Sequence, residues 1–244
     1  MKRWQILAGL GLVALSAALY WVHFLIFRDA HHIWIYLLGD VAFLPVEVLL
    51  VTLILHNLLE HRAKRTRLHK LNMVVGAFFS EVGTELAERL AAFDADCAAL
   101  AADLAAAGEW PERRFASTAR HLRDAPHPLE ASRGDLAGLR SFLIAKRPFL
   151  LALLENPNLL EHEGFTDMLW AVFHLTEELA RRRDLAAGPD SDREHLAGDI
   201  RRAYGRVLAE WLLYLAHLKR DYPYLFSLAV RTNPFDPQAR VEVA

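Results

Sequence analysis

Histidine and carboxylate side chains gather in the last third of the chain, and these are residue types that bind transition metals. The candidates are Glu161, His162, Glu163, His174, Glu177, Glu178, His195, Asp199 and His217. Helical bundles that hold two iron ions use Glu-x-x-His pairs, and the sequence contains none. The nearest pattern in this region, Asp192-x-x-His195, occurs once.

The expected register of the helices in this region keeps its two central histidines apart. If the helices on either side of residues 186–191 pack as antiparallel neighbours, His174 lies opposite Ala203 rather than His195. That offset of about eight residues corresponds to about 12 Å along a helix axis, which is too far for one shared metal ion. We therefore expect solvated or helix-capping roles for these side chains and predict no metal and no cofactor. A metal enzyme is the weaker alternative.

A second set of polar side chains lies inside a strongly apolar stretch, residues 36–55. Asp40 and Glu47 are seven residues apart, so on a helix they lie within about 20° of one face. Pro45 lies between them and cannot donate a backbone hydrogen bond to the preceding turn. His23 belongs to a polar stripe in an earlier apolar stretch. These four residues are therefore candidates for polar positions inside a membrane.

Two interpretations of the intramembrane carboxylates remain open. Insertion scales put the cost of Asp at the centre of a spanning helix at roughly 2.5 to 3.5 kcal/mol, so both side chains should turn away from lipid. In the structural interpretation, Asp40 bonds to His23 or Tyr20 across a helical hairpin, and Glu47 fixes helix pairing. In the functional interpretation, both carboxylates line an ion or proton path in an oligomer. The functional interpretation also includes an outer ion site formed by Asp29, His31 and His32.

Two apolar stretches are long enough to cross a membrane. Residues 4–27 carry no formal charge, and as a helix they reach about 36 Å, against about 30 Å for the hydrocarbon core of a bilayer. Residues 33–56 form a second stretch of similar length, and the short link 28–32 between them forces an antiparallel hairpin. A cleaved signal peptide is the alternative, but the first apolar stretch continues well past the small residues 16–18.

Basic residues at the ends of the two stretches predict their orientation. Lys2 and Arg3 precede the first stretch, whereas the link contains only Arg28. A basic cluster follows the second stretch and is suited to lipid headgroups: Arg62, Lys64, Arg65, Arg67 and Lys70. By the positive-inside rule, both termini face the cytoplasm, and the chain is a multi-pass protein of the cell inner membrane.

The rest of the chain shows helical periodicity without useful strand-like alternation. In residues 71–110, apolar side chains recur every three or four positions, as in Val74, Phe78, Val82, Leu86 and Leu90. Further helices are predicted at 112–124, at 136–155 with a kink or break at Pro148, at 164–183, and after a capping box formed by Ser191 and Glu194. The last long helix is expected to pack through one face, formed by Tyr204, Leu208, Trp211, Leu215 and Leu218.

Composition and motif content exclude several classes of function. A net charge of −2 gives no case for nucleic acid as a partner, and a single cysteine excludes an internal disulfide. The sequence has no Gly-rich phosphate loop, no Gly-x-Ser-x-Gly turn and no kinase motif. We therefore expect a protein that is not an enzyme.

These patterns predict an all-α protein, with a two-span transmembrane helical hairpin in residues 1–58 and a cytoplasmic α-helical bundle in residues 59–244. The predicted function is that of an oligomeric, membrane-anchored scaffold or interaction module. Its predicted partners are the lipid bilayer, further copies of the chain and a cytoplasmic protein. The alternative is an oligomeric ion channel, transporter or ion sensor that uses Asp40 and Glu47.

Overall fold

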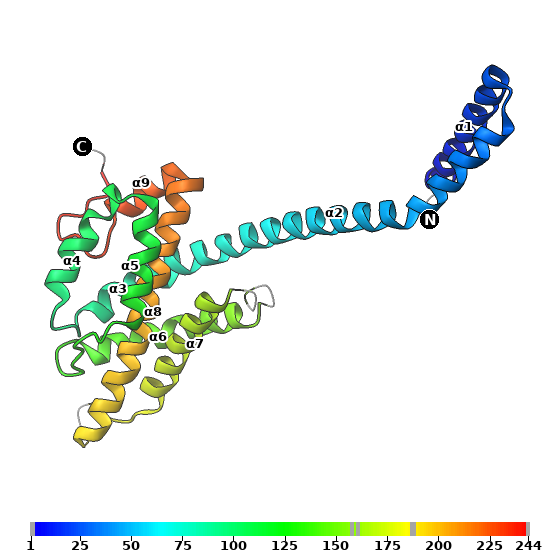
Figure 1. Ribbon diagram of the computed structural model, residues 1–244. Coiled ribbons are helices and arrows are strands. Elements are labelled where there is room, and N and C mark those ends of the chain that lie inside the picture. Colours follow the sequence, from blue (N-terminus) through cyan, green and yellow to red (C-terminus); the bar gives the residue numbers. More distant parts are fainter. Residues whose placement is uncertain (1–2, 157–158, 160–161, 186–188, 243–244) are drawn as a thin grey trace. The chain divides into compact units, whose positions relative to one another are not determined.

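The computed structural model describes residues 3–156, 159, 162–185 and 189–242, with side chains described at these positions except 3, 5 and 60–71. The described part of the chain is all helical, as the periodicity predicts (Figure 1). Its β-type backbone pairing is one isolated bridge between Asp94 and Leu129. The chain divides into two compact units, Met1–Lys64 and Arg65–Ala244.

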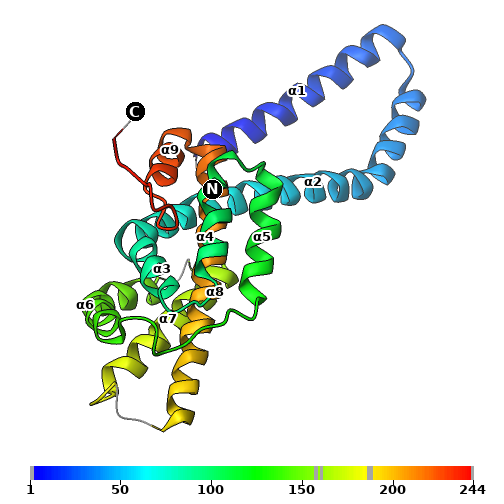
Figure 2. The same cartoon turned by 90° about the vertical axis from the view of Figure 1, so that its left-hand side faces the viewer.

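The first unit contains helix α1 (Arg3–Phe27) and the beginning of α2 (Ala30–Phe78), joined by two residues alone. The predicted link, residues 28–32, is therefore too long. Its error has a physical reason: Asp29 caps α2, since its Oδ1 accepts hydrogen bonds from the backbone N–H groups of His31 (2.9 Å) and His32 (3.2 Å). The chain reverses at Arg28, which has a left-handed backbone with φ of 50°. Figure 2 shows α1 and α2 meeting at this reversal.

Helix α2 is continuous through Pro45 and extends to Phe78. The backbone of the basic segment that follows the second apolar stretch is therefore part of the same helix. Proline removes one donor from the helical hydrogen-bond ladder, and the remaining bonds on either side of Pro45 keep the helix intact.

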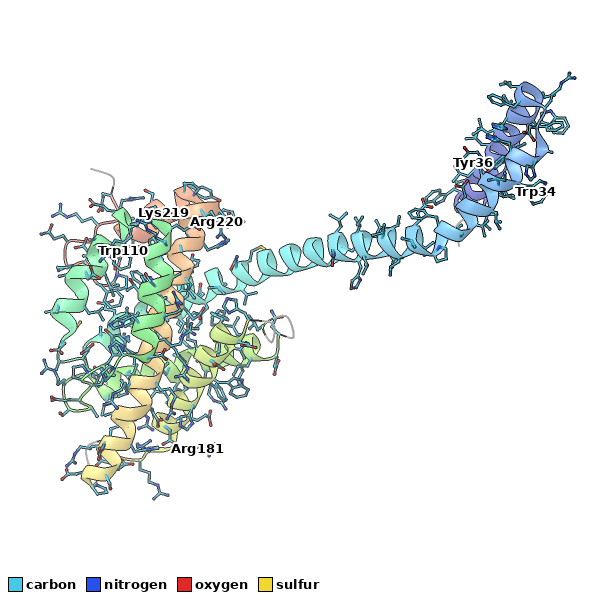
Figure 3. All side chains as sticks on the ribbon, viewed as in Figure 1. Trp34, Tyr36, Trp110, Arg181, Lys219 and Arg220 are labelled. Atoms are coloured by element: carbon cyan, nitrogen blue, oxygen red, sulfur yellow. The ribbon has the colours of Figure 1, made fainter. Side chains whose placement is uncertain are left out.

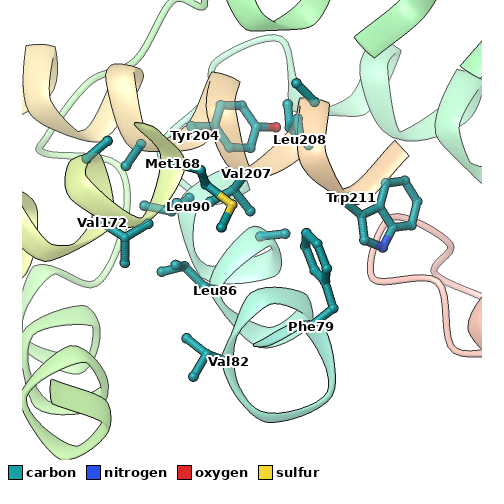
Figure 4. Close-up of a cluster of buried hydrophobic side chains, with 14 of the residues drawn as sticks. Phe79, Val82, Leu86, Leu90, Met168, Val172, Tyr204, Val207, Leu208 and Trp211 are labelled. Atoms are coloured by element: carbon teal, nitrogen blue, oxygen red, sulfur yellow. The ribbon is translucent and has the colours of Figure 1, made fainter. Parts of the chain in front are cut away.

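The second unit is built around α8 (Asp190–Asp221), the longest helix of that unit. Helix α8 packs against α3 (Thr84–Ala91), α5 (Glu112–Asp124), α7 (Glu163–Arg181) and α9 (Pro223–Arg231), while α6 (Leu136–Leu154) packs on α7. The predicted buried face of α8 is confirmed, with at most 3% exposure at Tyr204, Leu208, Trp211, Leu215 and Leu218. Figure 4 shows part of this core, where α8 residues meet Leu86 and Leu90 of α3 and Met168 and Val172 of α7.

A π-helical turn, η1 (Phe79–Gly83), joins α2 to α3. A wider turn changes which side chains face inward, and the neighbouring residues Phe78 and Phe79 are both buried here, at 0% and 1% exposure. Thr84 Oγ1 donates to the carbonyl of Phe79 over 2.8 Å. Gly83 lies under both rings: an added Cβ would be 2.4 Å from Phe79 Cδ1 and 2.6 Å from Phe78 Cε1.

The helical stretch predicted over residues 71–110 is interrupted in its alanine-rich part. Turns over residues 92–96 separate α3 from α4 (Cys97–Ala105), and a 3-10 turn, η2 (Ala106–Glu109), follows α4. In the interruption, the side chain of Phe93 is fully buried, and its carbonyl accepts a hydrogen bond from the N–H of Glu130 at 3.0 Å. Tertiary pairing and burial of this aromatic ring therefore outweigh the helix propensity of the alanines.

The structure bears on two further boundary predictions. Of the kink or break predicted at Pro148, the break is excluded, because helix α6 continues through the proline. Helix α8 begins at Asp190, directly after Pro189, so Ser191 lies inside the helix and does not cap it. The fixed φ of proline suits a residue that leads into a helix, which accounts for the earlier start.

Segment α4–η2 is held by side chains from much later in the chain. Lys219 Nζ donates to the carbonyls of Gly108 (3.1 Å) and Trp110 (2.7 Å), and Figure 3 shows Lys219 near Trp110. Asn233 Nδ2 donates to the carbonyl of Leu104 at 2.9 Å. Cys97, at the start of α4, is half-buried against the core, and burial followed by the charge of Asp94 raises the pKa of its thiol.

Candidate functional site

The first unit contains two helical segments that are long and apolar enough to cross a bilayer, Ile6–Phe27 and Ala30–Leu59. Their apolar windows are unburied in the structure, and large apolar side chains are exposed along both. Trp34 and Tyr36, drawn on α2 in Figure 3, are 67% and 59% exposed. By length and composition, the two segments are compatible with membrane anchoring, as they are with a signal sequence.

The polar residues of the first unit have neighbours that differ from the predicted ones. The ring of His23 stacks on that of His32, with centroids 5.8 Å apart and an interplanar angle of 4°. His23 Nδ1 is buried and has no hydrogen-bond partner among the described residues. The structure thus places His32, not Asp40, beside His23. Asp40 and Glu47 are exposed on the apolar part of α2, and their intramembrane role stays a prediction.

The predicted outer ion site coincides with the start of α2. Asp29 uses Oδ1 to cap this helix, and the ring of His32 contacts Tyr36 edge-on, with centroids 4.6 Å apart. An ion site formed by Asp29, His31 and His32 stays a prediction. The residues of the basic cluster belong to α2, whose backbone is described throughout this segment. The side chains of the cluster are not described; they are those of Arg62, Lys64, Arg65, Arg67 and Lys70.

Two histidines and two carboxylates converge where α7 and α8 face each other. His174 Nε2 lies 3.4 Å and His195 Nε2 lies 3.3 Å from the same atom, Oδ2 of Asp199. Possible ligand atoms of Glu178, His195 and Asp199 all lie within 4.8 Å of one another. The side chain of Asp199 is 2% exposed, whereas those of His174 and His195 are 47% and 57% exposed. Both imidazoles thus lie near one carboxylate oxygen, so the predicted offset of about 12 Å between His174 and His195 is too large.

The error in that prediction lies in the register of the helix pair. Helix α7 ends at Arg181, and the backbone at Arg182 is extended, so the helix is shorter than the predicted 164–183. His174 consequently faces Asp199 instead of Ala203, a difference of one helical turn or about 6 Å along the axis.

The sequence does contain a pattern that indicates this cluster. His174 precedes Glu178 by four residues, and His195 precedes Asp199 by the same interval. Residues four apart lie on one face of a helix, so each helix presents one imidazole and one carboxylate on a single face. A search for Glu-x-x-His tests a spacing of three and misses both pairs.

Two arginines border the cluster. Arg202 donates to Oδ1 of Asp199 at 2.9 Å, while Oδ2 of Asp199 is buried and has no hydrogen-bond partner among the described residues. Arg182 donates to Glu178 Oε2 at 2.5 Å and to Asp192 Oδ1 at 2.9 Å, and the bonds with Asp192 and then Glu178 raise the pKa of Arg182. In these contacts, each carboxylate of the cluster uses one oxygen for an arginine.

The other predicted histidine and carboxylate candidates make separate contacts. Glu177 accepts hydrogen bonds from Arg147 (2.7 Å) and Arg181 (3.0 Å), which lower the pKa of its carboxyl in that order. His217 Nδ1 lies 2.8 Å from Asp221 Oδ2. Glu163 is the first residue of α7, and Glu161 lies outside the described residues.

A cavity of about 360 Å³ in the second unit has the buried Glu210 and the partly buried His162 among its lining residues. Burial raises the pKa of Glu210 to about 7, and Arg123, with Nη2 3.7 Å from Glu210 Oε1, opposes this shift. Burial lowers the pKa of His162, whose Nδ1 accepts the N–H of Phe165 at 3.1 Å. Sequence reasoning missed Glu210, although a lone carboxylate on the apolar face of a helix indicates a buried acid.

The fold defines an all-helical protein with an apolar N-terminal helix pair and a larger helical unit. Two family models match it: "MJ1433, N-terminal helical domain" over residues 1–59 and "Uncharacterized protein MJ1433, C-terminal helical domain" over residues 67–231. The chain therefore belongs to the MJ1433 family. Uncharacterized protein MJ1433 of Methanocaldococcus jannaschii is 44% identical over 235 residues, which cover 96% of this chain and 94% of that protein. No solved structure matches the chain.

Proposed function

We propose that the protein is anchored in a cell membrane by α1 and the first part of α2, and that its second unit is a non-catalytic interaction module. The observation that carries this proposal is the exposure of apolar side chains along Ile6–Phe27 and Ala30–Leu59. Each Leu, Ile, Val or Phe left in water forgoes about 1.5 to 3 kcal/mol of burial free energy. A bilayer core removes this cost along both segments, and helices satisfy their own backbone groups there.

The interaction role rests on the second unit, which has its own hydrophobic core and a partly apolar surface. Large apolar side chains are exposed there at Ile144, Trp170, Tyr224, Leu225 and Leu228. Three of these belong to α9, which has no fully buried residue. Such side chains suit contact with a cytoplasmic protein or a further copy of the chain.

The proposed orientation places the link Arg28–Asp29 outside the cell and the second unit in the cytoplasm, following the distribution of basic residues. Cysteine labelling tests it in a Cys97→Ala background, because Cys97 is the single natural thiol. A membrane-impermeant maleimide should label Arg28→Cys in intact cells, but label Ser117→Cys, on the exposed surface of α5, only after lysis.

Alkaline carbonate extraction provides the matching test of anchoring. The protein should stay in the membrane pellet after this extraction and enter the soluble fraction only with detergent. Recovery of the full-length chain in the carbonate supernatant, or labelling of Ser117→Cys in intact cells, would contradict the proposal. Crosslinking in native membranes then reports the number of copies and the protein neighbours.

Ion handling is the second candidate function, because Asp40 and Glu47 are exposed on an otherwise apolar part of α2. The variants Asp40→Asn and Glu47→Gln keep side-chain size and remove charge. Ion handling would be favoured if vesicles containing the parent protein show ion flux across their membrane, and if the variants lose this flux while their assembly is unchanged. Absence of flux in the parent, together with impaired assembly in the variants, would favour a structural pairing role.

A further inference from the structure

We propose that α7 and α8 together form a binding site for a divalent first-row transition metal ion such as Zn²⁺, with His174, Glu178, His195 and Asp199 as ligands. The site is independent of the proposed membrane anchoring, because all four residues belong to the second unit. It would join the end of α7 to the beginning of α8 on either side of their connection.

The distances from Asp199 Oδ2 to the two imidazole nitrogens fit a tetrahedral ion. With metal–ligand bonds of about 2.0 to 2.2 Å, neighbouring ligand atoms in a tetrahedral zinc site lie about 3.3 to 3.6 Å apart. Asp199 Oδ2 lies 3.3 Å from His195 Nε2 and 3.4 Å from His174 Nε2. Glu178, His195 and Asp199 offer ligand atoms that all lie within 4.8 Å of one another. His174 lies outside this group of three, and its half-exposed imidazole would complete the tetrahedral set by turning toward the ion.

The buried oxygen of Asp199 indicates that this cluster binds a ligand. Oδ2 is inaccessible to solvent and lacks a hydrogen-bond partner among the described residues, even though two imidazole nitrogens lie close to it. These contacts therefore lack hydrogen-bond geometry, so the ring nitrogens are not aimed at the oxygen. A buried carboxylate oxygen without a partner is unfavourable, and a cation among the three atoms would satisfy it.

The bordering arginines have the arrangement expected of groups that orient metal ligands. Arg202 holds Oδ1 of Asp199, and Arg182 holds Oε2 of Glu178, so each guanidinium fixes a carboxylate through one oxygen. Hydrogen bonds of this kind restrict ligand rotation and tune affinity in metal sites. Because the arginine contacts involve the opposite oxygens, Oδ2 of Asp199 and Oε1 of Glu178 are the atoms we assign to the metal.

The ligand chemistry selects the class of ion. Two imidazole nitrogens with two carboxylate oxygens suit Zn²⁺ and its first-row neighbours, whereas Ca²⁺ and Mg²⁺ prefer oxygen ligands throughout. The half-exposed imidazoles of His174 and His195 leave the site open to solvent, which provides an entry path.

Metal titration of the full-length protein in detergent, free of affinity tag and stripped with chelator, tests the proposal. Zn²⁺ should bind at one ion per chain by calorimetry, and Co²⁺ should give visible absorption bands typical of tetrahedral coordination. Zn²⁺ should also raise the thermal unfolding midpoint, because the ion binds only the folded arrangement of the two helices.

The chain has 12 histidines, and matched variants separate the two proposed ligands from the other ten. His174→Gln and His195→Gln should each weaken Zn²⁺ binding by at least about tenfold and remove the tetrahedral Co²⁺ bands. His121→Gln, at an exposed position on α5, should leave both unchanged. Both ligand histidines are half-exposed, so their variants should fold normally in the absence of metal.

Three results would overturn the proposal. They are the absence of saturable Zn²⁺ binding by the parent, unchanged affinity in either ligand variant, or an equal loss of affinity in His121→Gln. In the first case, the cluster would be an ionic contact between helices and nothing more. Asp199→Asn adds a check on the buried oxygen, and weakened binding in a variant that keeps its parent's helix content would support the assignment.

Discussion

Glu210 shows at the scale of one residue how burial changes the chemistry of a side chain. Its carboxyl is 2% exposed, and Oε1 has no hydrogen-bond partner among the described residues. Arg123 Nη2 lies 3.7 Å from Oε1, which is too distant for a hydrogen bond. Burial therefore outweighs the arginine, and the pKa of Glu210 rises from 4.5 to about 7.

This shift predicts how stability changes with pH. The folded state binds the Glu210 proton more tightly than the unfolded chain does. The stabilisation of the folded state by this proton is therefore fully present below about pH 4.5 and is lost as the pH rises through about 7. A shift of this size corresponds to about 3 kcal/mol. Glu210→Gln stays neutral and should therefore be more stable than the parent above pH 7, but not at pH 4.5.

Urea unfolding of both proteins between pH 4.5 and 8, followed by circular dichroism, measures this difference. Glu130→Gln, at an exposed position, is the control and should keep the pH dependence of the parent. If Glu210→Gln loses stability with rising pH as steeply as the parent, the buried carboxyl is not the cause.

The residue scale also shows why the histidine cluster escaped sequence reasoning. The four-residue spacings were present, but their meeting depends on the end of α7 at Arg181. A helix boundary that is misplaced by two residues moves every predicted contact across the helix pair by several ångström. The burial of Asp199 adds information that spacing alone does not contain.

At the scale of elements, the π-helical turn η1 is the feature that sequence periodicity describes least well. The predicted face was Val74, Phe78, Val82, Leu86 and Leu90, and its last four members are buried to at least 99%. Val75 and Phe79 are buried as well, although each follows a member of this face by one residue and would point away from the face on an ordinary α-helix. An inserted residue in one turn changes the face that a helix presents, and apolar spacing alone cannot locate it.

Gly83→Ala tests the close packing within this turn. The new Cβ would overlap the buried rings of Phe78 and Phe79, so we expect the free energy of unfolding to fall by about 1 to 3 kcal/mol. Gly198→Ala, at a position in α8 with open space around the added Cβ, should instead be neutral or more stable by about 0.5 to 1 kcal/mol. Chemical unfolding measures both, and equal effects would contradict the proposed overlap.

The start of α6 gives a second prediction at this scale. Asp135 caps the helix by accepting the backbone N–H of Gly138 at 2.8 Å. Asp135→Ala should cost about 1 kcal/mol of stability, while Asp135→Asn keeps an acceptor and should cost less. Thermal and urea unfolding of the two variants compare them, and an equal loss in both would show that charge rather than capping matters.

Element boundaries were predictable where a local signal marks them. Residues 112–124 were predicted to be a helix, and α5 covers these residues, because prolines flank the segment on both sides. The link 28–32 was too long because a short acidic side chain can begin a helix within one residue of a reversal. The interruption at 92–96 depends on pairing with residues 128–130, which are distant in the sequence.

At the scale of the whole molecule, the division into two compact units predicts independent folding of the second. The fragment 65–244 contains the core, so it should be soluble, helical and cooperative in thermal unfolding without the apolar segments. Gel filtration and calorimetry of this fragment test the prediction. A fragment that aggregates or melts without cooperativity would show that the first 64 residues are needed for folding.

The all-helical class was predictable from composition and period, because no segment alternates as a strand does. Composition also identifies the two N-terminal segments that are long and apolar enough to be compatible with membrane anchoring. The distribution of Lys and Arg around these segments predicts a direction of membrane insertion. The hydrophobic periodicity does not determine the number of copies in an assembly.

The single thiol of the chain, that of Cys97, lies where α4 packs against the core. Its raised pKa keeps it in the slow-reacting protonated form. Its alkylation at neutral pH should therefore be slower than that of a fully exposed thiol, and detachment of this helix should accelerate it. The rate of Cys97 alkylation, followed by mass spectrometry, therefore reports local opening of α4 in the native protein without an introduced probe.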